Sequence, residues 1–333
     1  MTRTDLFSES TPMSLPEILV FAASPSESVM AQLEEHFHCH HVWSVPAAER
    51  DALIDRVGAN VRAVLTVGPI GIDAALAARL PRLEIVSLNS VGYDKVDLDA
   101  LSQRGIPVTN TPGVLTDDVA DLAVLLLLAA ARRLPAMDRY VRDGDWSARK
   151  PLLPSRSVRG KVAGIFGFGR IGQAIAGRLA ALGMDIRYFQ PRAVAGVAAP
   201  RTASLLELAW QSDFLVLSAP ATPATQHAVN ADVLAALGPQ GTLVNIARGS
   251  LVDEAALAAA LQGGQLGAAA LDVFEYEPEV PPALRALDNV VLTPHIGSLT
   301  VETRHAMGQL AVDNLLAHFA GRPLLTPVAL RRG

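Results

Sequence analysis

The sequence predicts an α/β protein made of two doubly wound parallel-sheet domains, and three observations lead to that fold class. Short runs of β-forming residues alternate with segments of helical period along nearly the whole chain. The chain has 333 residues, a length that suggests two domains rather than one. A glycine-rich motif lies near the middle, between one strand pattern and one helix pattern.

The N-terminal half carries a series of predicted strands with helical segments between them. The strands are expected at residues 17–23, 41–45, 62–67, 83–89 and, more briefly, 107–110. The intervening helices are expected at residues 26–37, 47–57, 71–80 and 95–103. No glycine motif follows the first strand, so this half is not the obvious nucleotide site.

A long apolar helix is predicted from Thr116 to Leu134, with Thr116 as its N-cap and arginines at its C-terminal end. Its surface is too apolar for a solitary exposed helix, so we expect it either at the centre of a domain or at a subunit contact. Residues 135–158 are interpreted as an arm or loop, and Trp146 within them as an interface or core residue. Helix and arm together predict a symmetric homodimer.

The glycine motif consists of Gly167, Gly169 and Gly172, which have the spacing G-x-G-x-x-G. It follows the apolar run 162–166 and precedes a segment of helical period. In that context the first glycine allows a tight turn, the second lets backbone approach a pyrophosphate, and the third lets the helix pack on the strand. The helix N-terminus then favours the phosphate charge. The pattern predicts a dinucleotide site, and the alternative is an ordinary strand–helix turn.

After this motif the alternation of strands and helices resumes. Further strands are expected at residues 185–189, 214–218, 242–246, 267–272 and 290–293. Further helices are expected at residues 204–209, 231–237, 254–263 and 301–321, and we interpret the alanine-rich helix 254–263 as packing. The second half is therefore predicted to be a Rossmann-type unit.

Polar residues stand where loops should leave three of these strands, and they suggest a catalytic site. They are Arg248, Glu277 and His295. Ligands of open α/β sheets bind outside the carboxyl ends of the strands, so these side chains could face one crevice. An arginine can clamp a carboxylate through two parallel hydrogen bonds, and a histidine can pass one proton near neutral pH. A carboxylate on the other ring nitrogen would orient that histidine and favour its protonated form.

Composition excludes several other classes of function. The net charge of −5 gives no electrostatic reason to expect nucleic acid or an anionic membrane as a partner. Cys39 is the only cysteine, so no intrachain disulfide can form, which favours a cytoplasmic location. Residues 1–16 lack the apolar core of a signal peptide, and the longest apolar run, 122–131, is too short to span a bilayer.

Histidines surround the single cysteine, at positions His36, His38, His40 and His41. A metal site is one interpretation of this cluster. Adjacent ligands at a helix end and strand start do not converge easily, however, and no second cysteine gives the usual paired spacing. We interpret the segment as a helix-to-strand turn and predict no metal.

With these motifs in place, the sequence resembles the D-isomer-specific 2-hydroxyacid dehydrogenases over nearly its whole length. The matching pieces are the glycine motif, Asn245-Ile-Ala-Arg-Gly, Ala270-Leu-Asp-Val-Phe, Glu277-Pro and Thr293-Pro-His-Ile-Gly. The resemblance implies that Arg248 holds the substrate carboxylate and keto oxygen. It also implies that Glu277 pairs with His295, and that His295 is the proton donor. The chain is then an NAD(P)-dependent enzyme that reduces a 2-keto acid to the D-2-hydroxy acid.

The resemblance also implies which residues bind the substrate and the cofactor. Backbone at Val91 and Gly92 is expected to hold the substrate carboxylate, together with Arg248 and His295. Asp272 is expected near the nicotinamide carboxamide. The residues expected to contact the cofactor are Thr116, Gly167, Phe168, Gly169, Arg170, Ile171, Gly172, Gln190, Arg192, Pro220, Thr225, Ile246, Ala247, Arg248, Asp272, His295 and Gly297.

The resemblance further implies a domain division and a branch of the family. A flavodoxin-like substrate domain would comprise residues 1–113 and 299–333, with a Rossmann cofactor domain, 114–298, inserted into it. The segment beginning Asn110-Thr-Pro-Gly-Val-Leu is typical of glyoxylate, hydroxypyruvate and hydroxyphenylpyruvate reductases. Arg149 stands where some glyoxylate reductases carry a tryptophan, so the preferred keto acid is left open.

The residues after the second strand of the Rossmann unit bear on the choice of cofactor. An NAD-preferring unit carries an acid at the end of this strand, which bonds the ribose 2′-hydroxyl. Here the position holds Gln190, and Arg192 follows two residues later. An arginine can pair with a 2′-phosphate, so we predict NADP(H), with NAD(H) also possible. The alternative is a solvent-facing arginine and mixed use of both cofactors.

A second hypothesis comes from a different functional class. A Rossmann protein of this family can serve as a nucleotide-sensing corepressor that recruits partners without catalysis. Such proteins usually add long tails, whereas the extensions here are residues 1–16 and a few residues after Leu325. We therefore favour the enzyme.

Overall fold

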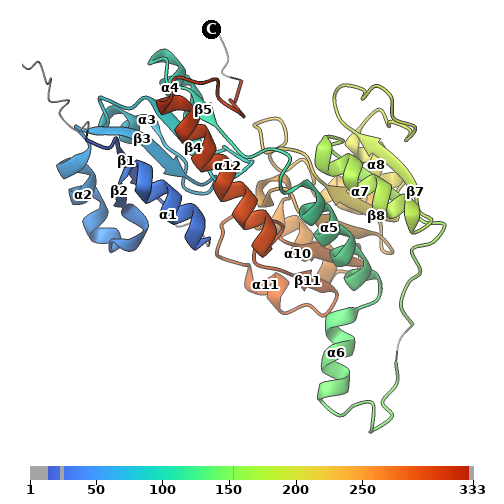
Figure 1. The fold of residues 1–333 in the computed structure, drawn as a ribbon. Helices are drawn as coiled ribbons and strands as arrows, with labels where there is room; N and C mark the ends of the chain where they lie inside the picture. The colour runs from blue at the N-terminus through green and yellow to red at the C-terminus, as the bar shows by residue number, and fades with distance from the viewer. Residues whose placement is uncertain (1–13, 23–25, 153, 330–333) are drawn as a thin grey trace, which may run out of the picture. The chain divides into compact units, whose positions relative to one another are not determined.

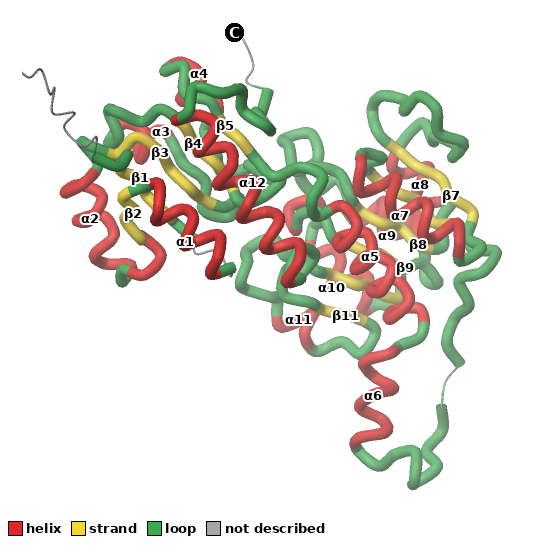
Figure 2. The backbone as a smooth tube through the Cα atoms, in the orientation of Figure 1, coloured by secondary structure: helices red, strands yellow, loops and turns green. Residues whose placement is uncertain are grey.

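The computed structural model describes residues 14–22, 26–152 and 154–329. The chain divides into two compact units, Met1–Pro112 with Arg304–Gly333, and Gly113–Thr303. Each unit contains one parallel sheet with helices packed against it, as Figures 1 and 2 show. The predicted fold class, two parallel-sheet α/β domains, is thereby confirmed.

The sheet of the first unit has the order β2-β1-β3-β4-β5, and all its neighbouring strands are parallel. Its strands are β1 Glu17–Val20, β2 His38–His41, β3 Val61–Thr66, β4 Ile85–Leu88 and β5 Val108–Thr109. This is the flavodoxin-like order, in which the winding direction reverses between the first and third strands.

Side chains along the strands of the first sheet point alternately into two cores, one on each face of the sheet. Ile18 and Val20 of β1 pack with α1 and α12 on one face, whereas Leu19 packs with α2, α3 and α4 on the other. The helices are α1 Glu27–His36, α2 Arg50–Val57, α3 Ala74–Ala78, α4 Leu98–Gln103 and α12 Val301–Phe319. The C-terminal helix α12 therefore completes a core begun by the first strand.

The predicted strand at 41–45 is wrong. The edge strand is β2, and it pairs with β1 from His38 to His41. The next residues, Val42–Ser44, form a 3₁₀ turn in which the Val45 N–H bonds to the carbonyl of Val42. Their β-branched and aromatic residues suggested a strand, whereas in the structure they form this turn with Val42 buried, at 1% exposed.

Two histidines of the cluster each pair with a glutamate. His40 bonds Glu17 at 2.9 Å, and His41 lies 3.2 Å from Glu34. Among the residues that the structure describes, no group of three or more metal-ligating side chains is placed to hold an ion.

The sheet of the second unit has the order β11-β10-β9-β8-β6-β7, again wholly parallel. Its strands are β6 Val162–Phe166, β7 Asp185–Phe189, β8 Phe214–Leu217, β9 Thr242–Asn245, β10 Ala268–Leu271 and β11 Val290–Leu292. A single parallel bridge between Tyr188 and Arg201 extends the sheet beyond β7. The winding reverses between β6 and β8, which is where open α/β sheets bind their ligands.

Helices cover both faces of this second sheet. Helix α5, Thr116–Ala131, packs against α7, Arg170–Ala181, and against β9, β10 and β11. The other face carries α8 Leu205–Trp210, α9 Ala231–Leu237 and α10 Glu254–Gln262, whose leucines form one core with those of β8, β9 and β10. A short helix, α11 Pro282–Arg285, precedes β11 and was not predicted. Helix α5 thus packs on the sheet of its own domain, while Leu125 stays 55% exposed, and its role at a subunit contact stays a prediction.

The region after α5 differs from the prediction. The helix ends at Ala131, Arg133 adopts a left-handed conformation with φ 55°, and a further helix, α6 Leu134–Arg142, begins. Pro135 favours this restart because its fixed φ suits the first turn of a helix. Figure 1 shows α6 extending away from the second sheet. Residues 135–142 are thus helical, where a loop or arm was expected.

One residue assignment in this region is wrong, and another is narrowed. Thr116 is the first helical residue of α5, and the N-cap is Leu115, which supplies no side-chain bond. Trp146 is 67% exposed within the chain, so it is not a core residue, and its interface role stays a prediction.

Among the described residues, every helix is too short or too polar to cross a bilayer.

Candidate active site

The glycine turn after β6 is shaped by close contacts that only glycine permits. Gly167 has φ +88°, and a Cβ there would lie 2.5 Å from the amide nitrogen of Ala219. A Cβ on Gly172 would lie 2.2 Å from the carbonyl oxygen of Gly167. These two glycines therefore bring the turn, the start of α7 and the end of β8 into contact.

Gly169 differs from its two neighbours in a way that bears on ligand binding. A Cβ built on Gly169 meets no heavy atom within 4 Å, so no contact inside the protein requires glycine there. Gly169 is also the N-cap of α7 and contributes no side-chain bond to it. The start of a twelve-residue helix thus faces open space without a side chain over it. This arrangement fits a pyrophosphate at the helix N-terminus.

Gln190 follows β7 and connects the glycine turn to the segment that carries Arg192. Its Oε1 accepts the Phe168 N–H at 2.9 Å, and its Nε2 donates to the Arg192 carbonyl at 2.8 Å. Arg201 donates to the carbonyls of Gln190, at 2.9 Å, and Pro191, at 3.0 Å. The Arg192 side chain lies on the surface. The predicted strand end was therefore placed correctly, and the Gln190 side chain bonds to its own turn.

The remaining predicted cofactor residues follow the C-terminal ends of strands or begin helices. Pro220 and Thr225 lie in the loop after β8, where the Thr225 hydroxyl donates to the Pro220 carbonyl at 2.8 Å. Phe168 is buried and stacks on Tyr188 at 4.3 Å between ring centroids. The residues that lie at helix starts or turns are Thr116, Arg170, Ile171, Ile246, Ala247 and Gly297.

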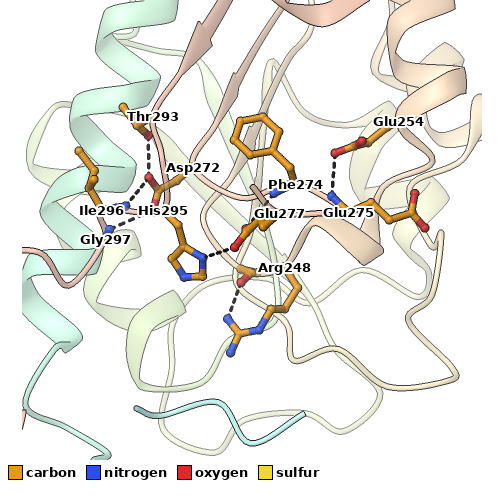
Figure 3. A network of polar contacts seen from close by, with 11 residues as sticks. Arg248, Glu254, Asp272, Phe274, Glu275, Glu277, Thr293, His295, Ile296 and Gly297 are labelled. Atoms are coloured by element: carbon orange, nitrogen blue, oxygen red, sulfur yellow. Dashed lines mark hydrogen bonds and ion pairs between the residues drawn. The ribbon is translucent and has the colours of Figure 1, made fainter. Parts of the chain in front are cut away.

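Arg248, Glu277 and His295 leave three neighbouring strands of the second sheet. Strands β9, β10 and β11 lie side by side, with Asn245 opposite Leu271 and Leu271 opposite Leu292. Their C-terminal ends therefore meet at one edge, and the three side chains follow those ends. Figure 3 shows the His295 ring turned toward Glu277, with the Arg248 side chain beside them. The structure thus brings the predicted trio together.

Glu277 holds one ring nitrogen of His295. Glu277 Oε2 lies 2.8 Å from His295 Nδ1, and Glu277 Oε1 accepts the Phe274 N–H at 3.0 Å. Partial burial raises the pKa of Glu277, but the bonds from His295 and Phe274 and the nearby charge of Arg248 outweigh it, so the pKa is lowered. Glu277 is therefore ionised at neutral pH, and Nε2 is the ring atom left to face a reactant.

Arg248 is positioned by the turn that follows β9. Asn245, buried at the end of that strand, accepts the Ala247 N–H at 3.0 Å and donates to the Arg248 carbonyl at 2.9 Å. Arg248 Nη1 donates to the Ala247 carbonyl at 2.6 Å. Sequence reasoning quoted Asn245 only as part of a motif and gave it no role, although a polar residue at the end of an apolar strand was its signal.

Asp272 holds the loop that carries His295. Its Oδ1 accepts from the Thr293 hydroxyl at 2.7 Å and the Ile296 N–H at 2.8 Å, and its Oδ2 accepts the Gly297 N–H at 3.0 Å. The residue is 1% exposed, and burial raises its pKa against the opposing effect of these bonds. Its carbonyl also accepts the His295 N–H at 2.8 Å, and His295 adopts a left-handed φ of 54°. Asp272 thus determines where the imidazole lies.

A comparison with known protein families identifies the family to which the chain belongs. Residues 124–297 match the model of the D-isomer specific 2-hydroxyacid dehydrogenase, NAD binding domain, which covers more than half of the chain. The chain belongs to the D-isomer-specific 2-hydroxyacid dehydrogenase family. It is an oxidoreductase of that family, and its second unit contains the family's NAD(P)-binding Rossmann domain.

Related proteins agree with the family assignment over nearly the full length. The chain is 50% identical to a hydroxyphenylpyruvate reductase from Plectranthus scutellarioides over 297 residues, which cover 89% of this chain and 94% of that one. It is also 50% identical to a glyoxylate/hydroxypyruvate reductase from Arabidopsis thaliana, with the same coverage.

Solved structures of family members have the same architecture. A 2-hydroxyacid dehydrogenase from Ketogulonicigenium vulgare is 46% identical, with a TM-score of 0.88, and covers 96% of this chain and 100% of that one. An NADPH-dependent glyoxylate/hydroxypyruvate reductase from Sinorhizobium meliloti, in complex with NADP and malonate, is 43% identical, with a TM-score of 0.85 and the same coverage.

The remaining predicted substrate residues of this 2-hydroxyacid dehydrogenase lie in the first unit. Val91 and Gly92 follow β4, and both of their carbonyls are held by side chains. Asn110 Nδ2 donates to the Val91 carbonyl at 2.9 Å, and the Ser90 hydroxyl donates to the Gly92 carbonyl at 2.8 Å. These bonds fix the carbonyls of the turn, which orients its peptide units.

Proposed function

We propose that the protein reduces a small 2-keto acid of the glyoxylate/hydroxypyruvate type to the D-2-hydroxy acid, with NADPH as the hydride source. The observation that carries this proposal is the 2.8 Å bond between Glu277 and His295, beside Arg248 at the next strand end. The named relatives are reductases and a dehydrogenase, which supports catalysis over the corepressor alternative.

Arg248 and the first unit orient the substrate. The guanidinium of Arg248 binds the carboxylate and the keto oxygen, and polarises the carbonyl bond. Backbone at Val91 and Gly92 takes part in holding the same carboxylate. On this assignment the substrate domain comprises residues 1–113 with 299–333, and residues 114–298 form the cofactor domain. The two compact units have nearly the same bounds, Met1–Pro112 with Arg304–Gly333 and Gly113–Thr303.

His295 supplies the proton that completes the reduction. When bound, the reduced nicotinamide supplies a hydride to the carbonyl carbon. The carbonyl oxygen then takes a proton from Nε2 of His295, so the ring must begin in its protonated form. The ionised carboxylate of Glu277 on Nδ1 stabilises that form, because its lowered pKa keeps it negatively charged at neutral pH. The ring is left neutral after each turnover and regains a proton from water.

The cofactor of choice is NADPH, and NADH is used less well. Gln190 places a neutral amide where an NAD-specific protein has an acid, so nothing at that position repels a 2′-phosphate. Arg192, exposed two residues later, supplies a positive charge for it. A relative of 43% identity is described as NADPH-dependent and binds NADP, which supports this assignment.

The assembly is a homodimer, and the location is the cytoplasm. The predicted interface is the apolar helix 116–134 with the arm to Trp146. Leu134, Val141 and Trp146 are exposed within the chain, and a twin subunit would cover them. The single cysteine, Cys39, supports a reducing compartment, and cell fractionation tests the location.

A substrate panel tests the proposed reaction. Purified protein is mixed with NADPH or NADH and with glyoxylate, hydroxypyruvate or hydroxyphenylpyruvate, and consumption of the reduced cofactor is followed by its absorbance. We expect turnover of at least one keto acid, with the D-enantiomer as the chiral product from hydroxypyruvate. Cofactor binding without consumption of any keto acid would instead support the corepressor alternative.

A further inference from the structure

A second set of acidic and basic groups lies behind the catalytic trio, and the proposed mechanism does not use it. Glu254 Oε1 accepts the Glu275 N–H at 2.9 Å, and Glu275 Oε1 lies 2.7 Å from His227 Nε2. Glu254 is the first residue of α10 and only 7% exposed. Figure 3 shows its carboxylate reaching the loop that carries Glu277. Sequence reasoning treated helix 254–263 as packing and so missed this contact.

The loop that Glu254 reaches is also in direct backbone contact with the Arg248 segment. A Cβ on Gly249 would lie 1.9 Å from the carbonyl carbon of Phe274 and 2.2 Å from the amide nitrogen of Glu275. The turn after Arg248 therefore packs on the same peptide unit whose N–H Glu254 accepts. Glu254, which lies five residues further along the chain from Gly249, holds that peptide unit from a second side.

The peptide unit just before it, between residues 273 and 274, orients Glu277. The Phe274 N–H donates to Glu277 Oε1 at 3.0 Å, and the other oxygen of Glu277 holds His295. A rotation of the backbone around Phe274 and Glu275 would therefore move the donor that orients the catalytic carboxylate. Proton transfer is sensitive to such displacements, since misplacement by about 1 Å can cost on the order of a hundredfold in rate.

We propose that Glu254 is a positioning residue for proton transfer: by binding the Glu275 amide, it fixes the loop that sets Glu277 against His295. The proposal rests on the reaction proposed above and adds a residue to it. Glu254 acts on His295 only through the backbone at 274–275 and through Glu277.

A carboxylate at position 254 is costly unless it serves such a contact. Burial raises the pKa of Glu254, and the negative charges of Glu275 and Glu277 raise it further, against the lowering effects of the Glu275 N–H bond and of His227. Helix α10 does not need this side chain as a cap, because Asp253 already accepts the Ala256 N–H at 3.0 Å. The position is thus explained by the loop that it holds.

Variants at two neighbouring acids test the proposal. Glu254→Ala removes the acceptor, Glu254→Gln keeps an acceptor of the same reach, and Glu254→Asp keeps the charge but shortens the reach. Asp253→Ala is the matched control, since it weakens the start of α10 without touching Glu275. The measurements are kcat and KM for keto-acid reduction against pH, NADPH affinity by fluorescence, and the melting temperature.

We expect Glu254→Ala and Glu254→Asp to lower kcat by about tenfold or more, while NADPH affinity stays within about twofold. The alkaline limit of reduction should move to lower pH, as we also expect for Glu277→Gln, which removes the negative charge beside His295. Glu254→Gln should recover most of kcat. Asp253→Ala should lower the melting temperature and leave kcat and the pH profile unchanged. If Glu254→Ala does not fold, the test rests on the difference in kcat between Glu254→Gln and Glu254→Asp.

Two outcomes overturn the proposal. One is an unchanged kcat and pH profile in both the alanine and aspartate variants. The other is an equal loss of kcat in Asp253→Ala, which would show that only the stability of α10 matters. These outcomes are distinct from failure of the proposed reaction, in which the wild type would turn over no keto acid and Glu277→Gln would have no activity to alter.

Discussion

The preference for NADPH over NADH can be tested at Gln190 and Arg192, in the turn that follows β7. Arg192→Ala removes the positive charge assigned to the 2′-phosphate, and Gln190→Glu places a carboxylate near the ribose. Glutamate is as long as glutamine, so it can still accept the Phe168 N–H that Gln190 binds at 2.9 Å. It loses only the donation to the Arg192 carbonyl. The glycine turn should therefore remain intact in both variants.

The size of the effect follows from one charge-assisted hydrogen bond. Such a bond contributes about 1.5–3 kcal/mol, which corresponds to roughly tenfold to a hundredfold in preference. The Arg192 side chain is exposed, and exposed ion pairs are weakened by solvent, so we expect the lower end, about tenfold, for Arg192→Ala. Gln190→Glu should shift the NADPH-to-NADH preference further toward NADH. Its negative charge repels the 2′-phosphate of NADPH, and its carboxylate accepts a hydrogen bond from the 2′-hydroxyl of NADH.

The assay is kcat/KM for NADPH and NADH with one saturating keto acid. Arg159→Ala is the matched control, since it removes an exposed arginine just before β6, at the amino end of the sheet. It should leave the NADPH-to-NADH ratio unchanged. A wild type that prefers NADH, or an Arg192→Ala variant with an unaltered ratio, would refute the assignment of the 2′-phosphate to this turn.

The other predictions concern the trio and the assembly. Arg248→Lys keeps the charge but loses the planar fork, so kcat/KM for the keto acid should fall by about tenfold or more with little change in cofactor affinity; near-normal kcat/KM would exclude the clamp. Glu277→Gln should move the alkaline limit of reduction to lower pH, and an unchanged profile would remove the pairing from the mechanism. The pKa of Glu277 is lowered on folding, so its stabilisation is complete above its unfolded value, about 4.3, and is lost as pH falls through the folded one. The melting-temperature gap between wild type and Glu277→Gln should therefore narrow in acid, whereas a constant gap would contradict the shift. Finally, sedimentation should show a dimer that Trp146→Glu weakens, and a stable, active wild-type monomer at micromolar concentration would refute the assembly.

Periodic patterns and glycine chemistry made most of the fold predictable. The strands of the second sheet were placed close to their observed bounds because each is a short apolar run ended by polar or glycine residues. Gly167 and Gly172 were read correctly because their roles are local, in a tight turn and in a helix packed against it. Arg248, Glu277 and His295 could be grouped because parallel strands bring their C-terminal ends to one edge.

What the sequence did not predict depends on contacts between distant segments or on competing local preferences. Val42 and its neighbours have strand propensity, yet the backbone turns there, with Val42 buried. The helix that begins at Leu134 was missed, because it follows a left-handed residue, Arg133, and no local pattern predicts that conformation. Glu254 lies in an alanine-rich segment, and its partner is an amide 21 residues away, so only the folded chain reveals its contact.

The most direct test of the central claim is the turnover of His295→Ala compared with wild type, in NADPH-dependent reduction of hydroxypyruvate. The account predicts that kcat falls by on the order of 10²–10⁴ while NADPH affinity, measured by fluorescence, is unchanged. A His295→Ala variant that keeps kcat within about threefold of wild type would contradict the assignment of His295 as the proton donor.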